Sequence, residues 1–218
     1  MISQYPWLRS TWELLTNAEK SNRLGQAYLF KAQEKLGAER LIEKLAKGLI
    51  CEKSGIEPCG KCRNCILTST TNFPDLIRIG LADKKDSISV ESVRELISFF
   101  STKPAFGTPK IAIIDSVESL NFYATNALLK IIEEPPKNSI FLLNWETPRP
   151  VPRTLTSRCQ QIIIPSPSRE TSLKWLADKG VEINKLNDKD AFLEGSPLEI
   201  LSQIHNNDPN SSVLKNVA

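Results

Sequence analysis

The sequence predicts an α/β protein in which a five-stranded, mostly parallel sheet is followed by a small helical region. Strand-like and helix-like segments alternate over the first three quarters of the chain, which is typical of parallel sheets. Most strand-like segments are continuous apolar runs, as expected where helices cover both faces of a sheet. The composition is that of a globular protein, since 40% of the 218 residues are hydrophobic and 24% are charged. This excludes wholesale disorder and fibrous repeats.

Five short runs are expected to form the strands. They are Ala27–Phe30, Asp75–Ile79, Lys110–Asp115, Ser139–Leu143 and Gln160–Ile164. Between them, apolar residues recur every three or four positions, which predicts helices with one buried face. These stripes are Leu41, Leu45 and Leu49, then Val93, Leu96, Ile97 and Phe100, and then Leu120, Ala124, Leu128 and Ile131. Because proline lacks a backbone amide, Glu133-Glu134-Pro135-Pro136 is expected to end the last helix.

The pattern changes after the fifth strand, where Pro165-Ser166-Pro167-Ser168 is typical of a linker. Helices are expected over Arg169–Lys179, near Asn187–Leu193 and from Pro197, with Ser168 as the N-cap of the first. We therefore predict an α/β domain over residues 1–165 and a helical domain over residues 166–218. The polar tail, Asn206–Ala218, is expected to be disordered.

The charge and hydropathy of the chain restrict its surroundings. The formal net charge is +3, without the dense basic stripe of a dedicated duplex-DNA binder. No apolar run approaches the ~20 residues that span a bilayer, and the N-terminus lacks the features of a signal peptide. The chain is therefore expected to be cytoplasmic, with no membrane partner. It has one histidine, His205, which disfavours histidine-based catalysis and histidine-rich metal sites.

Four of the five cysteines form a cluster with the spacing C-x7-C-x2-C-x2-C, namely Cys51, Cys59, Cys62 and Cys65. In a chain without a secretion signal, clustered cysteines are more often metal ligands than disulfides. Four thiolates complete a tetrahedral zinc site, and a four-cysteine iron–sulfur cluster is the chemical alternative. Since four protein ligands leave no open position, the zinc is expected to be structural. We expect residues 51–65 to be a local excursion between a helix and a strand.

A phosphate-binding loop is almost present after the first strand. The pattern G-x-x-x-x-G-K-[ST] falls on Ala32, Gly37, Ala38 and Glu39, and only Gly37 matches. A methyl group replaces the lysine that neutralises phosphate charge, and a carboxylate replaces the hydroxyl that binds magnesium. From these residues alone, the segment is also an ordinary strand–loop–helix connection.

The third apolar strand ends in an acidic residue, Asp115, as a Walker-B strand does. In many ATPases a second acid follows and activates water, but here Ser116 stands in that place. An aspartate at the end of a strand is weak evidence by itself, because many folds place one there.

Seven segments together carry a resemblance to a known family over nearly all of residues 1–205. They are Tyr5-Pro6-Trp7-Leu8, Ala27-Tyr28-Leu29-Phe30, the four cysteines, Phe73-Pro74-Asp75-Leu76, Asn126-Ala127-Leu128-Leu129-Lys130, Glu133-Glu134-Pro135-Pro136 and Ser157-Arg158-Cys159. The sequence resembles the clamp-loader subunits of bacterial DNA polymerase III, which are AAA+ proteins, and among them the delta prime subunits.

The resemblance implies a subunit that does not hydrolyse ATP. Motor subunits of the family keep an intact phosphate loop, an Asp-Glu pair and two sensor residues. Here Trp145 and Leu198 fall where the sensor threonine and arginine are expected, and no bound ATP is implied. Arg158, within Ser157-Arg158-Cys159, is implied to act in trans as an arginine finger in the ATP site of a neighbouring motor subunit.

The family also implies a role in DNA replication, as a non-catalytic subunit of a DNA-directed DNA polymerase holoenzyme. The implied partners are the gamma/tau motor subunits and the delta subunit, and indirectly the sliding clamp and primed DNA. The family's C-terminal collar domain is expected to be absent from this chain, so the chain alone is expected to be monomeric. Two alternatives remain, a divergent AAA+ ATPase that binds nucleotide itself and a zinc-containing nucleic-acid-binding module.

Overall fold

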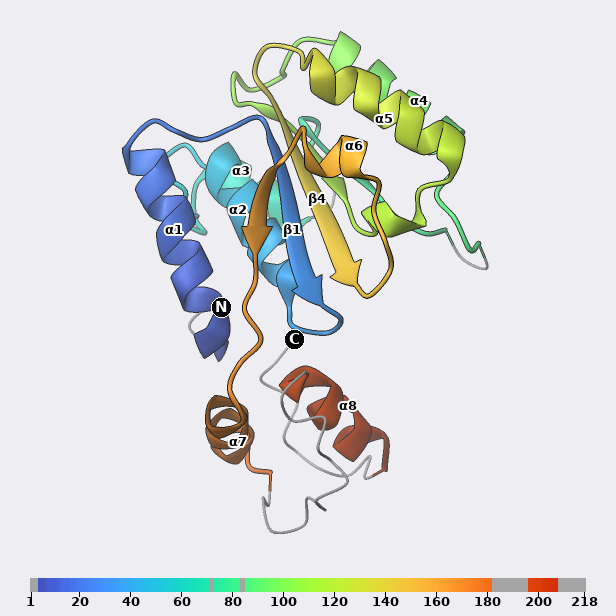
Figure 1. Cartoon of the computed structure of the whole chain (residues 1–218). Coiled ribbons are helices and arrows are strands. Elements are labelled where there is room, and N and C mark those ends of the chain that lie inside the picture. Colours follow the sequence, from blue (N-terminus) through green and yellow to red (C-terminus); the bar gives the residue numbers. More distant parts are fainter. Residues whose placement is uncertain (1–3, 71–72, 83–84, 182–195, 208–218) are drawn as a thin grey trace.

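A parallel sheet forms the centre of the computed structural model, which describes residues 4–70, 73–82, 85–181 and 196–207 (Figure 1). The five strands are β1 (Ala27–Gln33), β2 (Leu76–Ile79), β3 (Lys110–Ile114), β4 (Ser139–Thr147) and β5 (Gln160–Ile163). Their order is β2-β3-β4-β1-β5, and every neighbouring pair is parallel. The predicted fold class and all five predicted strands are therefore confirmed.

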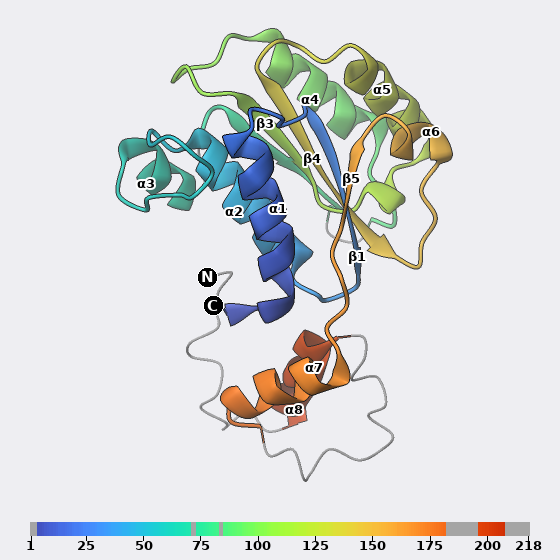
Figure 2. The ribbon, with the colours of Figure 1, turned by 60° about the vertical axis from the view of Figure 1, so that its left-hand side comes forward.

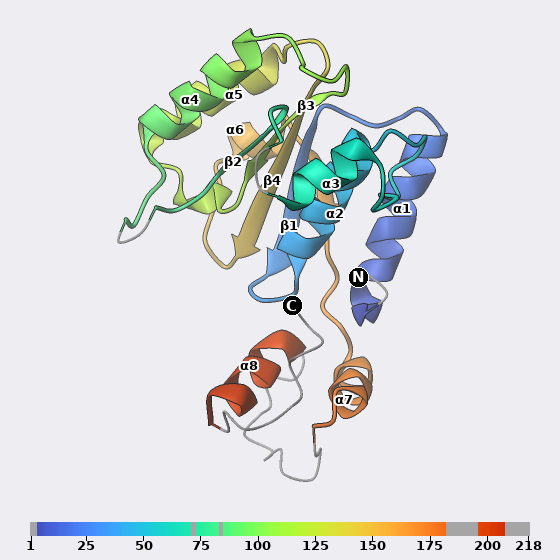
Figure 3. The same ribbon diagram turned by 180° about the vertical axis from the view of Figure 1, so that it is seen from behind.

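Helices cover both faces of the sheet, as Figures 2 and 3 show from two sides. One face carries α1 (Arg9–Lys20), α2 (Ala38–Ile50) and α3 (Arg63–Ser69), and the other carries α4 (Val90–Ser101), α5 (Phe122–Glu133) and the single turn α6 (Arg153–Thr156). Successive side chains of a strand point to opposite faces. Tyr28 and Phe30 accordingly pack with the α2 core, whereas Leu29 packs with the core under α4 and α5.

The strands that carry polar residues are longer than expected. β1 continues to Gln33 and β4 to Thr147, with Lys31 paired to Trp145 in the ladder between them. Helices α1, α3 and α6 were not predicted. Helix α5 starts at Phe122 rather than at Leu120, because the Asn121 side chain accepts a hydrogen bond from the Ala124 amide and caps the helix.

Two helices follow the sheet and lie beyond the carboxyl ends of its strands (Figure 1). They are α7 (Arg169–Asp178) and α8 (Pro197–Asn207), and Ser168 caps α7 as predicted. Because α8 continues to Asn207, the prediction of disorder from Asn206 is wrong for its first two residues. The predicted helix near Asn187–Leu193 and the rest of the tail lie outside the described residues. Among the described helices, none is long and apolar enough to cross a membrane.

Candidate functional site

The loop between β1 and α2 lies at the carboxyl end of the sheet, where the phosphate-loop pattern falls. Gly37 precedes α2 with a φ of 81°, a left-handed conformation that favours glycine. Ala32 and Ala38 are buried and offer no polar group. The Glu39 carboxylate lies 3.8 Å from the Arg40 guanidinium. The connection is therefore built as expected, without the side chains that bind phosphate and magnesium.

Residues at the start of α8 and in the N-terminal segment bond to two carbonyls and one ammonium group of this loop. The Ser196 hydroxyl donates to the carbonyl of Lys35 at 3.1 Å, and the Lys35 ammonium pairs with Glu199. The Trp7 indole donates to the carbonyl of Leu36 at 2.8 Å. A methyl group of Leu198, the predicted sensor position, would lie 3.5 Å from a Cβ placed on Gly37. Leu198 therefore packs against the loop.

Aromatic side chains fill the space between the start of α2 and helix α7. Tyr5, Trp7 and Trp175 are buried, and their ring centroids lie 5.3–6.1 Å from one another. The guanidinium of Arg40 lies 5.3 Å from the Tyr5 ring. These contacts join the N-terminal segment, α2 and α7 through one aromatic cluster.

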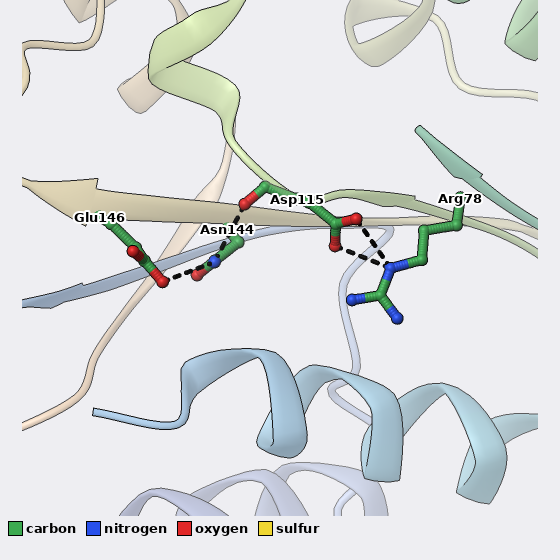
Figure 4. Close-up of polar contacts among 4 residues, drawn as sticks. All are labelled: Arg78, Asp115, Asn144 and Glu146. Carbon is green, nitrogen blue, oxygen red and sulfur yellow. Dashed lines mark hydrogen bonds and ion pairs between the residues drawn. The ribbon is translucent and has the colours of Figure 1, made fainter. Parts of the chain in front are cut away.

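The carboxylate of Asp115 follows β3 at the same end of the sheet. The Nε of Arg78, from β2, donates to both of its oxygens at 2.8 and 2.9 Å (Figure 4). This pair raises the pKa of Arg78. The next residue, Ser116, precedes a short 3-10 helix (Val117–Ser119) and supplies no acid. The positive charge beside the Walker-B aspartate is therefore an arginine of this chain, which the sequence analysis did not single out.

Two half-buried glutamates lie beside this aspartate. Asn144 of β4 donates to the Asp115 carbonyl at 3.0 Å and to the Glu146 carboxylate at 3.4 Å (Figure 4). Burial raises the pKa of both Glu118 and Glu146. At the predicted sensor position, Trp145 donates its indole N–H to the Arg149 carbonyl at 2.7 Å. No sensor hydroxyl stands there.

At the opposite, amino-terminal end of the sheet, Arg158 lies in the turn between α6 and β5. Its Nε and Nη2 lie 2.7 and 2.6 Å from one carboxylate oxygen of Glu133, the last residue of α5. Its Nη1 donates to the Thr154 carbonyl at 2.8 Å. Two segments that carried the family resemblance, Glu133–Pro136 and Ser157–Cys159, are thereby brought together. The sequence analysis did not predict this pairing.

The residues on either side of Arg158 fix the turn. Ser157 donates to the Thr154 carbonyl at 3.2 Å, and Leu155 is fully buried. Cys159 is buried too, and burial raises the pKa of its thiol to about 12. A thiol with such a pKa is inert at neutral pH, so Cys159 is a core residue.

The four clustered cysteines come together at the end of α2. Their sulfur atoms all lie within 4.8 Å of one another, and two pairs lie at 3.9 and 4.0 Å. A tetrahedral zinc site with Zn–S bonds of about 2.3 Å requires sulfurs roughly 3.8 Å apart, so the arrangement fits such an ion. Backbone amides of Cys62 and Cys65 donate to the Cys59 and Cys62 sulfurs, respectively, as in a metal knuckle. The group could therefore bind a metal ion.

The acidity of these thiols differs with their surroundings. Hydrogen bonds from the Lys61 and Cys62 amides lower the pKa of Cys59 to about 6, whereas burial raises the pKa of Cys65 to about 12. A bound cation would favour the thiolate at both positions, since metals bind the deprotonated form.

The cysteine segment, residues 51–65, lies between α2 and β2 as expected, and it also packs against the main core. Ile56 is buried with the residues of α2, and a Cβ on Gly48 would meet the Ile56 carbonyl at 1.8 Å. The Trp12 indole of α1 donates to Glu57 at 3.1 Å. Asn64 donates to the Ile50 carbonyl at 3.0 Å. The segment thus links α1, α2 and α3.

Comparison with solved structures agrees with the fold. A DNA polymerase III gamma subunit-related protein from Thermotoga maritima superposes with a TM-score of 0.56 at 18% identity, covering 88% of this chain and 61% of that one. A single-substitution variant of RuvB from the same organism gives a TM-score of 0.51 at 12% identity, covering 91% and 60% of the two chains. At such identities the likeness shows the fold alone, which is the AAA+ fold.

Sequence relatives are more specific. DNA polymerase III subunit delta' is 32% identical over 203 residues in Pseudomonas aeruginosa (91% of this chain, 60% of that protein) and 32% over 174 residues in Escherichia coli K12 (79% and 52%). The Haemophilus influenzae subunit tau/gamma is 41% identical over 148 residues (67% and 21%). The chain thus spans about half to three fifths of these delta' relatives. The family model described as "DNA polymerase III, delta subunit" matches residues 7–168. The chain therefore belongs to the delta' family of DNA polymerase III clamp-loader subunits.

Proposed function

We propose that this chain acts as a non-hydrolysing subunit of a bacterial clamp loader and lends Arg158 to the ATP site of a neighbouring motor subunit. The observation that carries the proposal is the contrast between the two ends of the sheet. At the carboxyl end, the phosphate and magnesium ligands are missing, and Arg78 is paired with Asp115. At the amino end, the Arg158 guanidinium lies at an exposed turn.

The chemistry of ATP hydrolysis gives Arg158 its role. In the neighbouring site, water attacks the γ-phosphorus while the bond to the oxygen bridging the β-phosphorus breaks, and negative charge builds on the transferred group and on ADP. A guanidinium can neutralise this charge through two parallel hydrogen bonds. In this chain, Ser116 stands directly after Asp115, where motor subunits carry the acid that activates water.

The proposed partners follow from the family. We expect the chain to assemble with gamma/tau motor subunits and the delta subunit, and through them to support loading of the sliding clamp onto primed DNA in the cytoplasm. We expect one structural zinc ion on Cys51, Cys59, Cys62 and Cys65. The sulfur geometry supports this ligand set.

The central test measures ATP turnover by the complex assembled with its motor and delta subunits. Arginine fingers supplied in trans are worth about 10³–10⁵ in rate. Because only one of several sites loses its finger, we expect Arg158→Ala to slow total ATP turnover and clamp loading by a smaller factor than this. Arg158→Lys should restore only part of it, since an ammonium lacks the planar fork.

The matched control is Arg153→Ala, at the exposed first residue of α6. We expect this complex to turn over ATP at close to the wild-type rate. A wild-type rate with Arg158→Ala would exclude Arg158 as the finger, and slow turnover with Arg153→Ala would then make Arg153 the next candidate.

A second test addresses nucleotide binding by the chain itself. Ala38 supplies no ammonium group and Glu39 repels phosphate, so calorimetric titration with Mg-ATP should give no binding in the micromolar range. Micromolar binding that is lost on substitution of Gly37 would instead support the divergent-ATPase alternative.

A further inference from the structure

The guanidinium of Arg158 is held by contacts within this chain that leave one edge of it open. A guanidinium has five N–H donors. A single oxygen of Glu133 lies against the Nε–Nη2 edge, and the Thr154 carbonyl accepts from Nη1. Among the described residues, these contacts engage three donors and leave one N–H on each Nη atom. Nη1 and Nη2 together make the outer edge of a guanidinium, a fork that can bind a phosphoryl group in a bidentate way, and each keeps a donor for it.

We propose that Glu133 is the positioning residue of the trans arginine finger, holding Arg158 by its inner edge so that its outer edge is presented to the neighbour's phosphate. This inference rests on the proposed function of Arg158. Its basis is the division of donors between the two edges. Because phosphate and Glu133 would use different edges, the pair does not have to break when the finger engages.

Both backbones that carry this pair are fixed in the core. Glu133 follows the buried Ile132 at the end of α5, and Arg158 lies between the buried Leu155 and Cys159. The long arginine side chain is otherwise free to sample many rotamers. The ion pair therefore removes the remaining freedom, which is the freedom of the side chain. Catalysis is sensitive to such positioning, since a displacement of about 1 Å can cost 100-fold in rate.

The test compares ATP turnover of assembled complexes that carry Glu133→Ala, Glu133→Gln, Arg158→Ala or the Ala/Ala double substitution. We expect Glu133→Ala to lower kcat by a smaller factor than Arg158→Ala does, with complex assembly and the melting temperature of the chain unchanged. Glu133→Gln keeps an acceptor of the same shape and should lie between Glu133→Ala and wild type. The double variant should be no slower than Arg158→Ala, because Glu133 acts only through Arg158.

The neighbouring Glu134 provides the matched control. It is an exposed acid of the same segment, and Glu134→Gln should leave turnover at the wild-type rate. If Arg158→Ala slows turnover and Glu133→Ala does not, the positioning role is overturned while the finger stands. Faster turnover with Glu133→Ala would make Glu133 a brake, and additive losses in the double variant would make its effect independent of Arg158, so either result overturns the inference. A wild-type rate with Arg158→Ala removes both proposals.

Discussion

The two ends of the parallel sheet each hold an arginine paired with a carboxylate, and the two pairs are built differently. At the carboxyl end, Arg78 contacts both oxygens of Asp115, and the loop carbonyls of Lys35 and Leu36 accept bonds from α8 and the N-terminal segment. At the amino end, Arg158 meets one oxygen of Glu133 and one carbonyl. Among the described residues, Arg78 is bonded through its Nε alone, and Oε2 of Glu118 and Oδ1 of Asn144 are buried at that end without a hydrogen-bond partner. Arg158, in contrast, engages Nε, Nη1 and Nη2 within the chain and lies at an exposed turn. The two ends therefore differ in how each arginine is held and exposed, and the carboxyl end is not fully satisfied by the chain itself.

This comparison shows what stands in the place of the phosphate and magnesium ligands at the carboxyl end. In an active site of this fold, the loop amides, a lysine and a magnesium ion balance phosphate charge. Here, other parts of the same chain contact the loop and the aspartate, through loop carbonyls rather than through the amides that would bind phosphate. An arginine pairs with the Walker-B aspartate, and Leu198 packs on Gly37. Loss of the phosphate ligands is thus accompanied by internal contacts at the same place.

The largest effect is expected in the cysteine segment, residues 51–65, which follows the C-terminal end of α2, away from the β1–α2 loop. Cys62→Ser should abolish binding of one zinc ion per chain and lower Tm by on the order of 10 °C, because metal binding at such sites is coupled to folding. Packing of Ile56 and Glu57 on α1 and α2 should carry the effect into the main core. Metal analysis and calorimetry check both parts. Cys159→Ala, outside the cluster, should keep the metal, and iron with inorganic sulfide in place of zinc would contradict the assignment.

The next substitution tests the packing of the cysteine segment on α2 without changing a metal ligand. Gly48→Ala places a Cβ 1.8 Å from the Ile56 carbonyl, a clash with backbone that a rotamer change cannot relieve. We expect it to lower the free energy of unfolding by about 3 kcal/mol in urea titrations. Gly25→Ala is the control, since its Cβ would meet the end of the Gln160 side chain at 3.2 Å and Tyr28 only at 3.9 Å, both of them side-chain atoms. Equal stability of the two variants would mean that the cysteine segment is held loosely.

The sequence was sufficient where a pattern is local. Short apolar runs, most of them continuous, identified every strand of the described residues, and the four-cysteine spacing identified the cluster. It was insufficient where the pattern is sparse. Helix α1 is amphipathic but mostly polar: Thr11 and Leu15 are buried while Leu14 is half exposed, so few apolar residues mark it. The polar ends of β1 and β4 are strands because they pair with each other, and apolar periodicity cannot reveal that pairing.

The ion pairs could not be predicted for a different reason. Arg78 and Asp115 are 37 positions apart, and Arg158 and Glu133 are 25 apart. Each pair meets because two strands or a helix and a turn end at the same edge of the sheet, and strand order is not written in local patterns. The available signal was that charged residues lie at the ends of neighbouring predicted elements. Choosing among such residues requires the order β2-β3-β4-β1-β5.

A smaller effect is expected from breaking the pair at the carboxyl end. Arg78→Ala removes the charge beside Asp115, and we expect a loss of about 1 kcal/mol in the free energy of unfolding, because both side chains are partly exposed. Asp115→Asn and the double variant complete the cycle, in which the coupling should account for most of that loss. Mg-ATP should still not bind to Arg78→Ala. Binding by this variant would show that the arginine, rather than the missing lysine, keeps nucleotide out.

The smallest effect concerns the buried glutamates beside that pair. Burial raises the pKa of Glu146 and of Glu118, so the folded state binds more protons than the unfolded state between the ordinary value of about 4.3 and the raised values. Stability should therefore fall as pH rises through that window, and the cost should be fully present at neutral pH. Because solvent screens these half-buried groups, we expect each to contribute a few tenths of a kcal/mol.

Glu146→Gln tests this sign, because the amide keeps an acceptor for the Asn144 donor and removes the charge. The variant should be slightly more stable than wild type at pH 7, and its stability should change less between pH 4 and pH 7 in urea titrations. Lower stability of the variant at pH 7 would mean that a cation favours the Glu146 carboxylate in the folded protein. The carboxyl end would then hold a ligand after all, and the contrast between the two ends of the sheet would fail at this residue.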